Sequence, residues 1–332
     1  MDKFVIMLTC SGGGLSAELR RRLLESKRYD IKIVAVDSKD SATARIFSNY
    51  FSVVPNGNDR NYVDSIKKIV LKYKVNMVIP CSDEEALSLS EKREKIETNG
   101  CTLACVDHKI LKILSSKIET YRLLSKNGVK TPEFYEANSI NELKSKVNIL
   151  LEKQIDAVVK PACGRGGRNV SVISNKKSDN HISKNIFFNH DIKLYKNLFP
   201  VIVMEKLVNP IYDVDMLSID GSLVRSVVRR RINPKVPNDG HIIENNIALH
   251  TLANNISKIF NLSWLYDCDI MMHPKGDPMV LEINPRPSGS ISVSLAAGIN
   301  FIEDMIAIYN KDKLNTKVVV KDKIIVPYTS LI

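Results

Sequence analysis

Residues 266–286 read Tyr-Asp-Cys-Asp-Ile-Met-Met-His-Pro-Lys-Gly-Asp-Pro-Met-Val-Leu-Glu-Ile-Asn-Pro-Arg, two apolar runs around a tight turn. A hairpin centred on Lys275-Gly276 would place Asp269 directly opposite Glu282. Asn284 shares their face, because it lies two positions beyond Glu282 on the same strand. The stretch therefore predicts two carboxylates and an amide together on one face of a hairpin.

Like charges held this close are destabilising unless a cation lies between them, and Mg²⁺ selects hard oxygen ligands. We therefore expect Asp269, Glu282 and Asn284 to bind Mg²⁺ or Mn²⁺. Asp267 is two residues from Asp269 and would point to the same face of the strand, so it could take the place of Asp269 as a ligand. The simpler alternative is a hairpin whose polar residues face water, but it does not explain the rigid basic turn at 285–289, Pro-Arg-Pro-Ser-Gly.

Upstream, residues 158–170 read Val-Val-Lys-Pro-Ala-Cys-Gly-Arg-Gly-Gly-Arg-Asn-Val. Lys160 ends a strand, and Arg165, Gly166 and Gly167 lie in the loop that follows it. Glycines let backbone N–H groups approach phosphate oxygens, and the cations offset phosphate charge. The pattern indicates a phosphate-binding loop, with an exposed hairpin turn as the alternative. No G-x-x-x-x-G-K-[ST] motif is present, so a P-loop is excluded.

The first third of the chain alternates strands with helices, which predicts a doubly wound parallel sheet with ligands at the strands' carboxyl ends. The expected strands are 4–8, 31–36, 75–79 and 102–106, and the expected helices lie near 15–23 and 62–73 and after Ser82. The loop Ser11-Gly12-Gly13-Gly14 is not G-x-G-x-x-G, so an NAD site is not expected.

The remainder contains a linker helix near 116–126 and a second lobe. The other expected elements are a helix opening at Ser139, strands at 157–161, 170–173 and 201–204, a polar, mobile stretch at 175–197, a hairpin at Asp220-Gly221, and helices near 247–259 and 301–309.

The composition narrows the class of protein. The net charge is +11, but the lysines are spread along the whole chain and only one Trp is present, so neither nucleic acid nor a membrane is an expected partner. No apolar run is long enough for a signal peptide or a membrane span. The six scattered cysteines are expected to be reduced thiols, and the location to be cytoplasmic.

Residues 201–207, Val-Ile-Val-Met-Glu-Lys-Leu, resemble the hinge strand of ATP-grasp enzymes. Four motifs follow one another in the same order as in that superfamily: a strand that ends in a lysine, a glycine-rich loop, the hinge strand, and Asp…Glu-x-Asn-Pro-Arg. The resemblance covers nearly the whole chain. Residues 78–85 and 117–132 resemble the branch related to the carbamoyl-phosphate synthase large subunit and biotin carboxylase. The resemblance implies an α/β fold: a doubly wound pre-ATP-grasp domain, then a two-lobed α+β ATP-grasp domain. The implied boundaries are 1–112, 113–206 for the linker helix and lid lobe, and 207–332 for the lobe with the metal.

The resemblance also implies roles for single residues. The phosphates of ATP would contact Lys117, Lys160, Arg165, Gly166 and Gly167. Adenine would contact Glu205 and the backbone of Lys206 and Leu207. The metal would be held by Asp269, Glu282 and Asn284. Catalysis would depend on Arg286 and Lys160 at the transferred phosphoryl group. The ribose contact falls near Ile211 or Asp213, of which we choose Asp213.

Three further features have more than one interpretation. His241 would edge the nucleotide pocket, or else be a lone surface histidine. One or more of Arg229-Arg230-Arg231 would contact a phosphate or carboxylate, since alternation sends the middle residue to the opposite face. The loop at 11–14 would face the acceptor substrate.

The implied activity is an ATP-dependent carboxylate–amine ligase, or carboxylate–thiol ligase, acting on small molecules through an acyl phosphate. A kinase-like enzyme and a non-catalytic nucleotide-binding regulator are alternatives, although a pure binder needs fewer charges at the γ-phosphate. Carbamoyl-phosphate synthase itself is not expected, because it carries two ATP-grasp halves. The sequence identifies neither substrate, and a homodimer is compatible with it.

Overall fold

The computed structural model describes residues 3–164, 168–175, 182–314 and 322–328. The chain divides into two compact units. Unit 1 comprises residues 1–112, 210–269 and 283–332, and unit 2 comprises 113–209 and 270–282. The predicted domain 1–112 and most of the predicted domain 207–332 thus belong to one unit, because they share the apolar core described below.

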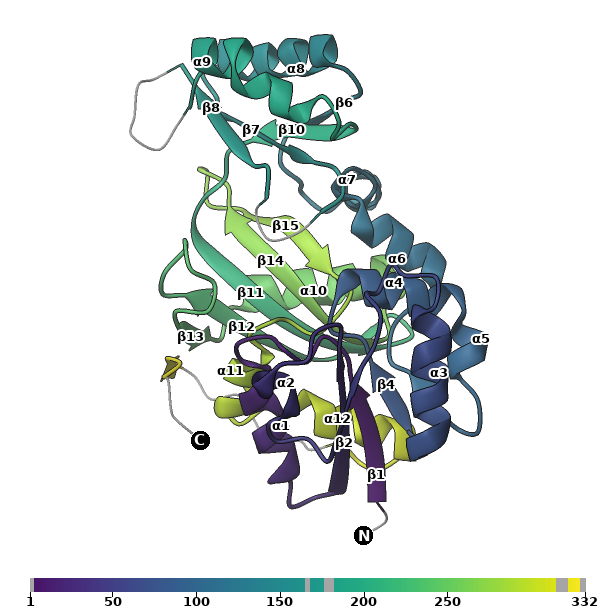
Figure 1. Cartoon of the computed structure of the whole chain (residues 1–332). Coiled ribbons are helices and arrows are strands. Elements are labelled where there is room, and N and C mark those ends of the chain that lie inside the picture. Colours follow the sequence, from purple (N-terminus) through teal and green to yellow (C-terminus); the bar gives the residue numbers. More distant parts are fainter. Residues whose placement is uncertain (1–2, 165–167, 176–181, 315–321, 329–332) are drawn as a thin grey trace. The chain divides into compact units, whose positions relative to one another are not determined.

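The N-terminal part of unit 1 is a parallel sheet with strand order β3-β2-β1-β4-β5 (Figure 1). Its strands are β1 (Lys3–Leu8), β2 (Asp30–Asp37), β3 (Tyr50–Val53), β4 (Met77–Ile79) and β5 (Thr102–Leu103). Leu8 pairs with Ala35 on one side and Ile79 on the other, so the strand order reverses at β1. The predicted doubly wound sheet is confirmed. The edge strand β3, which is four residues long, was not predicted.

Helices connect these strands. The helices α1 (Ser16–Leu24), α3 (Tyr62–Tyr73) and α4 (Asp83–Glu91) lie where the sequence predicts them, whereas α2 (Ala42–Arg45), α5 (Arg93–Ile96) and α6 (His108–Ser115) were not predicted. At the start of α4, Ser82 Oγ accepts a hydrogen bond from the backbone N–H of Glu85, as an N-cap residue does.

The C-terminal part of the chain forms a sheet with order β15-β14-β11-β12-β13-β16. Its strands are β11 (Val208–Ile219), β12 (Ser222–Arg231), β13 (His241–Glu244), β14 (Trp264–Met272), β15 (Pro278–Asn284) and β16 (Ile324–Ile325). The predicted Asp220-Gly221 turn joins β11 to β12, and both residues have positive φ, 46° and 78°. Three helices accompany the sheet: α10 (Ile247–Ile259), α11 (Ile291–Ala296) and α12 (Phe301–Asn310).

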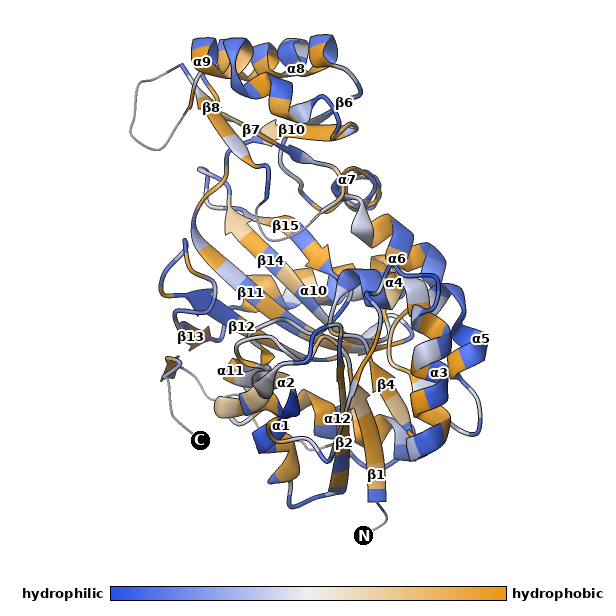
Figure 2. Ribbon diagram, viewed as in Figure 1, coloured by the Kyte–Doolittle hydropathy of each residue, from blue (hydrophilic) through white to orange (hydrophobic). Residues whose placement is uncertain are grey.

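One core connects the two parts of unit 1. It joins Phe4 and Leu23 of the N-terminal part to Leu265 on β14 and to Phe301 and Ile306 on α12. Figure 2 shows the hydrophobic colouring of β1 and β4 that accompanies this burial.

Unit 2 is built on a mixed sheet with order β6-β10-β7-β8-β9, preceded by the linker helix α7 (Lys117–Lys126). The strands are β6 (Phe134–Ala137), β7 (Ala157–Pro161), β8 (Ser171–Ser174), β9 (Ile182–Ser183) and β10 (Val201–Glu205). Helices α8 (Ile140–Glu152) and α9 (Lys184–Asn189) lie over one face of this sheet, and α8 shows the striped hydropathy of an amphipathic helix (Figures 1 and 2).

The expectation of a mobile stretch at 175–197 is wrong for residues 182–195. These form β9, α9 and a 3₁₀ helix, η1 (Asp191–Tyr195). Phe187, Ile192 and Tyr195 are buried in the core of unit 2. The apolar residues of this segment lie among polar ones without a sustained helical or strand period, so they did not predict these short elements.

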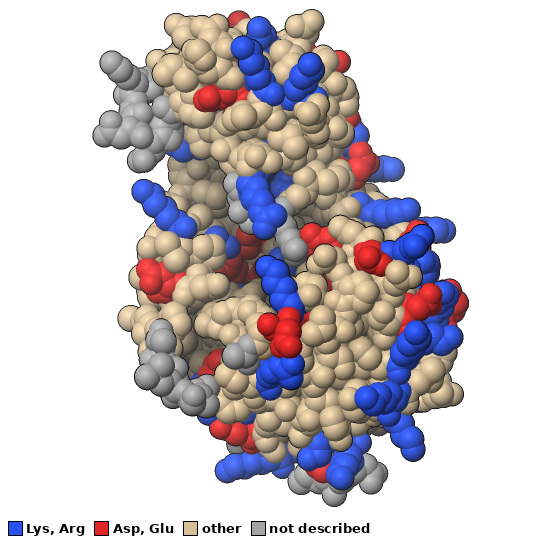
Figure 3. All heavy atoms as spheres, in the orientation of Figure 1, with Lys and Arg blue, Asp and Glu red and all other residues tan. Residues whose placement is uncertain are grey.

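Within the described part of the chain, no helix is long and apolar enough to cross a membrane. Figure 3 shows Lys and Arg distributed over the visible face with Asp and Glu among them. All six cysteines are free thiols.

Candidate active site

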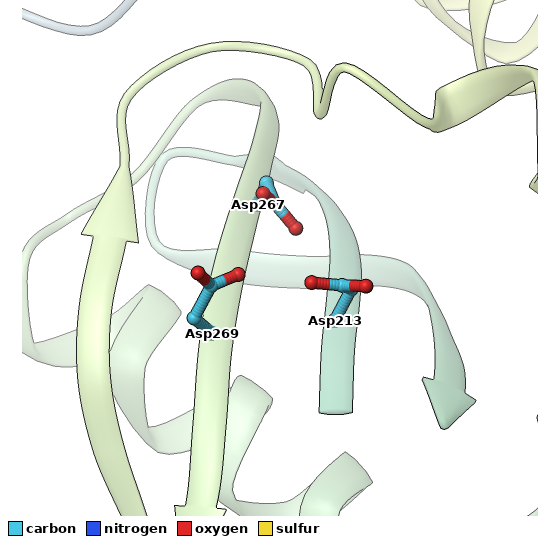
Figure 4. Close-up of side chains that lie close together, drawn as sticks. All are labelled: Asp213, Asp267 and Asp269. Carbon is cyan, nitrogen blue, oxygen red and sulfur yellow. The ribbon is translucent and has the colours of Figure 1, made fainter. Parts of the chain in front are cut away.

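Three carboxylates from two neighbouring strands meet in unit 1. Asp267 and Asp269 share a face of β14 because they are two residues apart, and Asp213 comes from the adjacent β11 (Figure 4). One carboxylate oxygen of each lies within 4.8 Å of the others. We call these three residues the carboxylate cluster.

Two of the three carboxylates, Asp213 and Asp269, form close ion pairs. Arg231 contacts both Asp213 and Asp269, at 3.1 Å from its Nη2 to Oδ1 of Asp269. His241 Nε2 lies 2.7 Å from Asp213 Oδ2. Burial opposes ionisation of Asp213, but the hydrogen bonds from His241 and Arg231 outweigh it and hold its pKa well below the usual range.

Asp267 has a different environment. Its Oδ2 accepts a hydrogen bond from Asn284 Nδ2 at 3.1 Å, whereas its Oδ1 has no hydrogen-bond partner among the described residues. The nearest guanidinium nitrogens, from Arg229 and Arg286, are 3.9 Å from its oxygens. Burial, and then repulsion from Asp213 and Asp215, raises the pKa of Asp267 to about 7. A buried carboxylate oxygen without a partner, in an all-oxygen donor set with Asp269 and Asn284, fits a divalent cation such as Mg²⁺.

Arg286 lies on the turn that follows β15. Its Nε donates to Asp83 Oδ1 at 3.1 Å, and Asp83 is the first residue of α4, directly after the capping residue. The basic turn and the loop after β4 are therefore adjacent within unit 1, which the sequence did not indicate.

Further contacts hold the loop at 11–14 in unit 1. The backbone N–H of Gly12 donates to Asp37 Oδ2 at 2.8 Å, and a side chain at Gly12 would bring its Cβ to 3.1 Å from that oxygen. The fully buried Arg20 donates through Nη1 to the carbonyl of Ser11 at 2.9 Å. The loop is thus fixed at the carboxyl ends of β1 and β2.

In unit 2, Lys117 contacts the start of the glycine-rich loop and a carboxylate of β15. Its Nζ donates to the carbonyl of Gly164 at 2.7 Å and lies 3.2 Å from Glu282 Oε2. Arg165, Gly166 and Gly167 lie outside the described residues. Glu282 is therefore the partner of a lysine here, whereas it was expected as a metal ligand beside Asp269.

Lys160 lies on the sheet face that is opposite the core of unit 2. It pairs with Ile202 across β7 and β10, whereas the neighbouring pair Val159 and Val203 points into the core. Lys160 is 6% exposed, so its charge lies in a largely desolvated position.

At the hinge, Glu205 is held by its own unit. Its Oε1 accepts the backbone N–H of Glu133 at 2.8 Å, and its Oε2 lies 3.2 Å from His273 Nε2. The backbone N–H of Lys206 donates to Asp156, so it is not available to adenine. Leu207 lies between β10 and β11, and its backbone stays the predicted contact for adenine.

Two expectations from the sequence need revision. Asp213, chosen for the ribose, has both carboxylate oxygens engaged by Arg231 and His241. The alternative of a surface position for His241 is wrong, because the residue is fully buried against Asp213. Asp213 and His241 meet because β11, β12 and β13 are adjacent and their alternation sends these side chains to one face.

Three residues of this face were not chosen as site residues from the sequence: Asp215, Arg229 and Arg231. Their signal was the spacing of two between Asp213 and Asp215 and between Arg229 and Arg231, on strands joined by a short hairpin. Arg230, the middle residue of its triplet, points the other way and pairs with Glu244, as alternation predicts.

Comparison with known families assigns the chain. Residues 114–206 match the ATP-grasp domain, and residues 197–330 match the family described as ATP-grasp in the biosynthetic pathway with Ter operon. The chain belongs to the ATP-grasp superfamily. Residues 8–104 match the PylC-like N-terminal domain, so the parallel sheet of unit 1 is the pre-ATP-grasp domain of this ATP-grasp protein.

The ATP-grasp chain is distantly similar to formate-dependent phosphoribosylglycinamide formyltransferases. Identity is 22% over 316 residues with that of Prochlorococcus marinus (strain MIT 9515), covering 90% of this chain and 75% of the relative. With that of Methanococcus vannielii it is 24% over 213 residues, covering 64% of this chain and 50% of the relative. This chain therefore spans three quarters of the first relative and only half of the second.

Solved structures share the ATP-grasp fold at low identity. N5-carboxyaminoimidazole synthetase from Staphylococcus aureus gives a TM-score of 0.70 at 14% identity, covering 95% of this chain and 79% of that one. L-amino acid ligase from Bacillus licheniformis gives 0.66 at 15%, covering 92% and 73%. The biotin carboxylase domain of Hydrogenobacter thermophilus 2-oxoglutarate carboxylase, solved with MgADP and bicarbonate, gives 0.68 at 14%, covering 95% and 71%.

Proposed function

We propose that this ATP-grasp protein is a ligase that uses Mg·ATP to activate a small-molecule carboxylate as an acyl phosphate, which an amine then attacks. The observation that carries the proposal is Asp267, a buried carboxylate with an unpartnered oxygen beside Asp269 and Asn284. A pure nucleotide binder has no need of such a charged group together with Arg286.

The names of the similar proteins support a small carboxylate as the substrate that is activated. Formate is the acid named for the similar formyltransferases, and an amino acid for the similar ligase. Both are small carboxylates, and we assign that class to this chain. In the reaction, a carboxylate oxygen attacks the γ-phosphorus of ATP, ADP leaves, and the amine nitrogen then displaces phosphate from the acyl carbon.

Residues of unit 1 would bind the metal. Asp267, Asp269 and Asn284 would hold Mg²⁺ or Mn²⁺, whereas Glu282, expected as a ligand from the sequence, belongs to unit 2 and pairs there with Lys117. Bound there, the ion supplies positive charge that offsets the charge developing on the transferred phosphoryl group. Arg286 would contribute a second, fixed positive charge, oriented by its hydrogen bond to Asp83.

Residues of unit 2 would bind the nucleotide. Lys117 and Lys160 would bind phosphates, together with the loop of Arg165, Gly166 and Gly167, and the backbone of Leu207 would meet adenine. Glu205 would shape the adenine position rather than bind through its carboxylate, since both its oxygens already have partners. These residues act by binding and orientation, which needs no nucleophile from the chain.

The decisive experiment is a screen for ADP release over pairs of small carboxylates and amines in the presence of Mg·ATP. Release that depends on one carboxylate, with formation of an amide, would establish the ligase. Release of a phosphorylated product without an amine would favour a kinase-like enzyme, and absence of turnover with every pair would contradict the proposal.

Mg·ATP is expected to raise the melting temperature more than ATP with a chelator does. A ligand that binds only the folded state stabilises it by mass action, and the metal adds to that binding. Differential scanning calorimetry on the purified chain measures both shifts. Equal shifts with and without Mg²⁺ would contradict the metal site.

Lys160→Ala is expected to weaken ATP binding by about tenfold or more, since it deletes a desolvated cation, whose hydrogen bonds to charged groups are worth roughly 1.5–3 kcal/mol. Isothermal titration with ATP gives the affinity directly. Lys146→Ala, a change on the exterior of α8, is the control. Unchanged affinity in Lys160→Ala would remove this residue from the phosphate site.

A further inference from the structure

The turn that follows β15 is attached to the strand β12 by a single buried arginine. Arg229 is fully buried, and its Nε and Nη2 lie 2.9 Å from Oδ2 and Oδ1 of Asp215 on the adjacent strand β11. Only Nη2 donates a hydrogen bond to Asp215, whereas Nε lies at ion-pair distance from Oδ2 without a hydrogen-bond partner among the described residues. The ion pair to Asp215 therefore holds the guanidinium group through Nη2.

The remaining donors of Arg229 reach the turn itself. Nη2 donates to Ser288 Oγ at 2.9 Å, and Nη1 donates to Ser290 Oγ at 2.6 Å. Ser294 Oγ donates to Asp215 Oδ2 at 2.5 Å, so the same ion pair also holds α11. Arg229, Asp215 and these three serines form what we call the arginine network.

Ser290 shows that this attachment replaces an ordinary helix cap. It occupies the N-cap position of α11, yet its side chain makes no capping hydrogen bond to any described residue. Its hydroxyl oxygen accepts from Arg229 instead. A serine in this position usually satisfies a free N–H of the first helical turn. The hydroxyl of Ser290 thus holds Arg229 and does not cap α11.

Two residues of the proposed site lie at the end of β15 and on the turn that follows it. Asn284 donates to Asp267, and Arg286 donates to Asp83. The backbone N–H of Arg286 donates to the carbonyl of Asn284 at 2.8 Å, and prolines at 285 and 287 restrict the chain on either side. With few free torsions, the anchored serines determine where both side chains lie.

Arg229 cannot act on a substrate directly, because it is fully buried and its guanidinium nitrogens face groups of this chain. We propose that Arg229 is a positioning residue for phosphoryl transfer, which holds Asn284 and Arg286 in place through Ser288 and Ser290. The inference rests on the proposed function for its kinetic part only. A lysine would keep the charge but lose the fork that joins Asp215 to both serines.

The test compares Arg229→Lys with Arg225→Lys in the full-length chain. Arg225 is a matched control, since it lies on the same strand and forms an ion pair with Asp304 at 2.9 Å outside the arginine network. Arg229→Lys should lower kcat about 10- to 100-fold while leaving KM for ATP within a few-fold, as supporting residues around a metal site do. Arg225→Lys should change neither constant by more than a few-fold.

Hydrogen exchange at residues 286–291 gives a readout that needs no turnover. Exchange there should accelerate in Arg229→Lys and stay at the wild-type rate in Arg225→Lys. Ser288→Ala with Ser290→Ala should reproduce both effects while keeping the ion pair to Asp215, and it carries the test if Arg229→Lys does not fold.

The outcomes separate the two proposals. Unchanged hydrogen exchange at 286–291 in the serine variant would overturn the positioning role. A change in KM for ATP as large as the change in kcat would also overturn it. If the wild type releases no ADP with any substrate pair, the proposed ligase activity fails, and the exchange measurement still decides whether Arg229 holds the turn.

Discussion

Asp267→Asn is expected to lower turnover by about two orders of magnitude or more, since a catalytic metal contributes several kcal/mol and each tenfold in rate corresponds to about 1.4 kcal/mol. The substitution keeps an oxygen for the hydrogen bond from Asn284 and removes one negative charge from the carboxylate cluster. Steady-state ADP release and Mg²⁺ titration measure the loss. Asp277→Asn, an exposed change in the turn of the same hairpin, should keep wild-type turnover.

The same variant should be more stable than the metal-free wild type, and this gain should depend on pH. The folded-state pKa of Asp267, about 7, lies above its ordinary value of 3.8, so ionisation opposes folding. Below the ordinary pKa the group is neutral in both states and costs nothing. The penalty grows as pH rises between the two values and is complete above the folded pKa.

Urea unfolding without metal measures this directly. The midpoint of Asp267→Asn should exceed that of the wild type at about pH 8, and the difference should shrink towards about pH 4. A variant that is folded, no more stable at pH 8 and within a few-fold of wild-type turnover would show that Asp267 is neither strained by its charge nor a ligand.

Glu282→Gln is the second large effect expected. It removes a charge that lies 3.2 Å from Lys117, and it tests whether this carboxylate serves the metal or the lysine. As a metal ligand, its loss should lower turnover by about two orders of magnitude and raise the Mg²⁺ concentration needed, with a smaller change in ATP affinity. Glu136→Gln, which breaks an exposed ion pair with Arg122 in the same unit, is the control.

A double-mutant cycle with Lys117→Ala separates the two roles. If Glu282 serves only to orient Lys117, the double variant should lose no more than Lys117→Ala alone. If it also binds the metal, its effect on the Mg²⁺ requirement should persist without the lysine. A folded Glu282→Gln enzyme with normal Mg²⁺ dependence would leave Glu282 with the orienting role alone.

The elements that could be predicted from the sequence are those with strong local signals. Helix α3 spans Tyr62–Tyr73 and α10 spans Ile247–Ile259, both as the spacing of apolar residues predicted. The two-residue turn at Asp220-Gly221 and the serines at 82 and 139 that begin helices were equally visible, because each signal depends on a few adjacent residues.

The composition of the carboxylate cluster was less accessible. The alternation of side chains along one hairpin was enough to group Asp269 with Asn284. Asp213 and His241 lie near them only because β11 and β13 belong to the same sheet, in the order β14-β11-β12-β13. Strand order is a tertiary property and leaves no mark on local spacing. The same holds for the pairing of Glu282 with Lys117, which are 165 positions apart in the sequence.

The shared core of unit 1 has a consequence for how the chain is made. Phe4 and Leu23 are synthesised well before their partners Phe301 and Ile306. Residues 113–209 can complete most of unit 2 in the meantime, since its core partners lie within that span. The nascent segment that contains Phe4 and Leu23 therefore keeps apolar surface uncovered until residues 301–306 are synthesised, which makes it a client for chaperones that shield such surface.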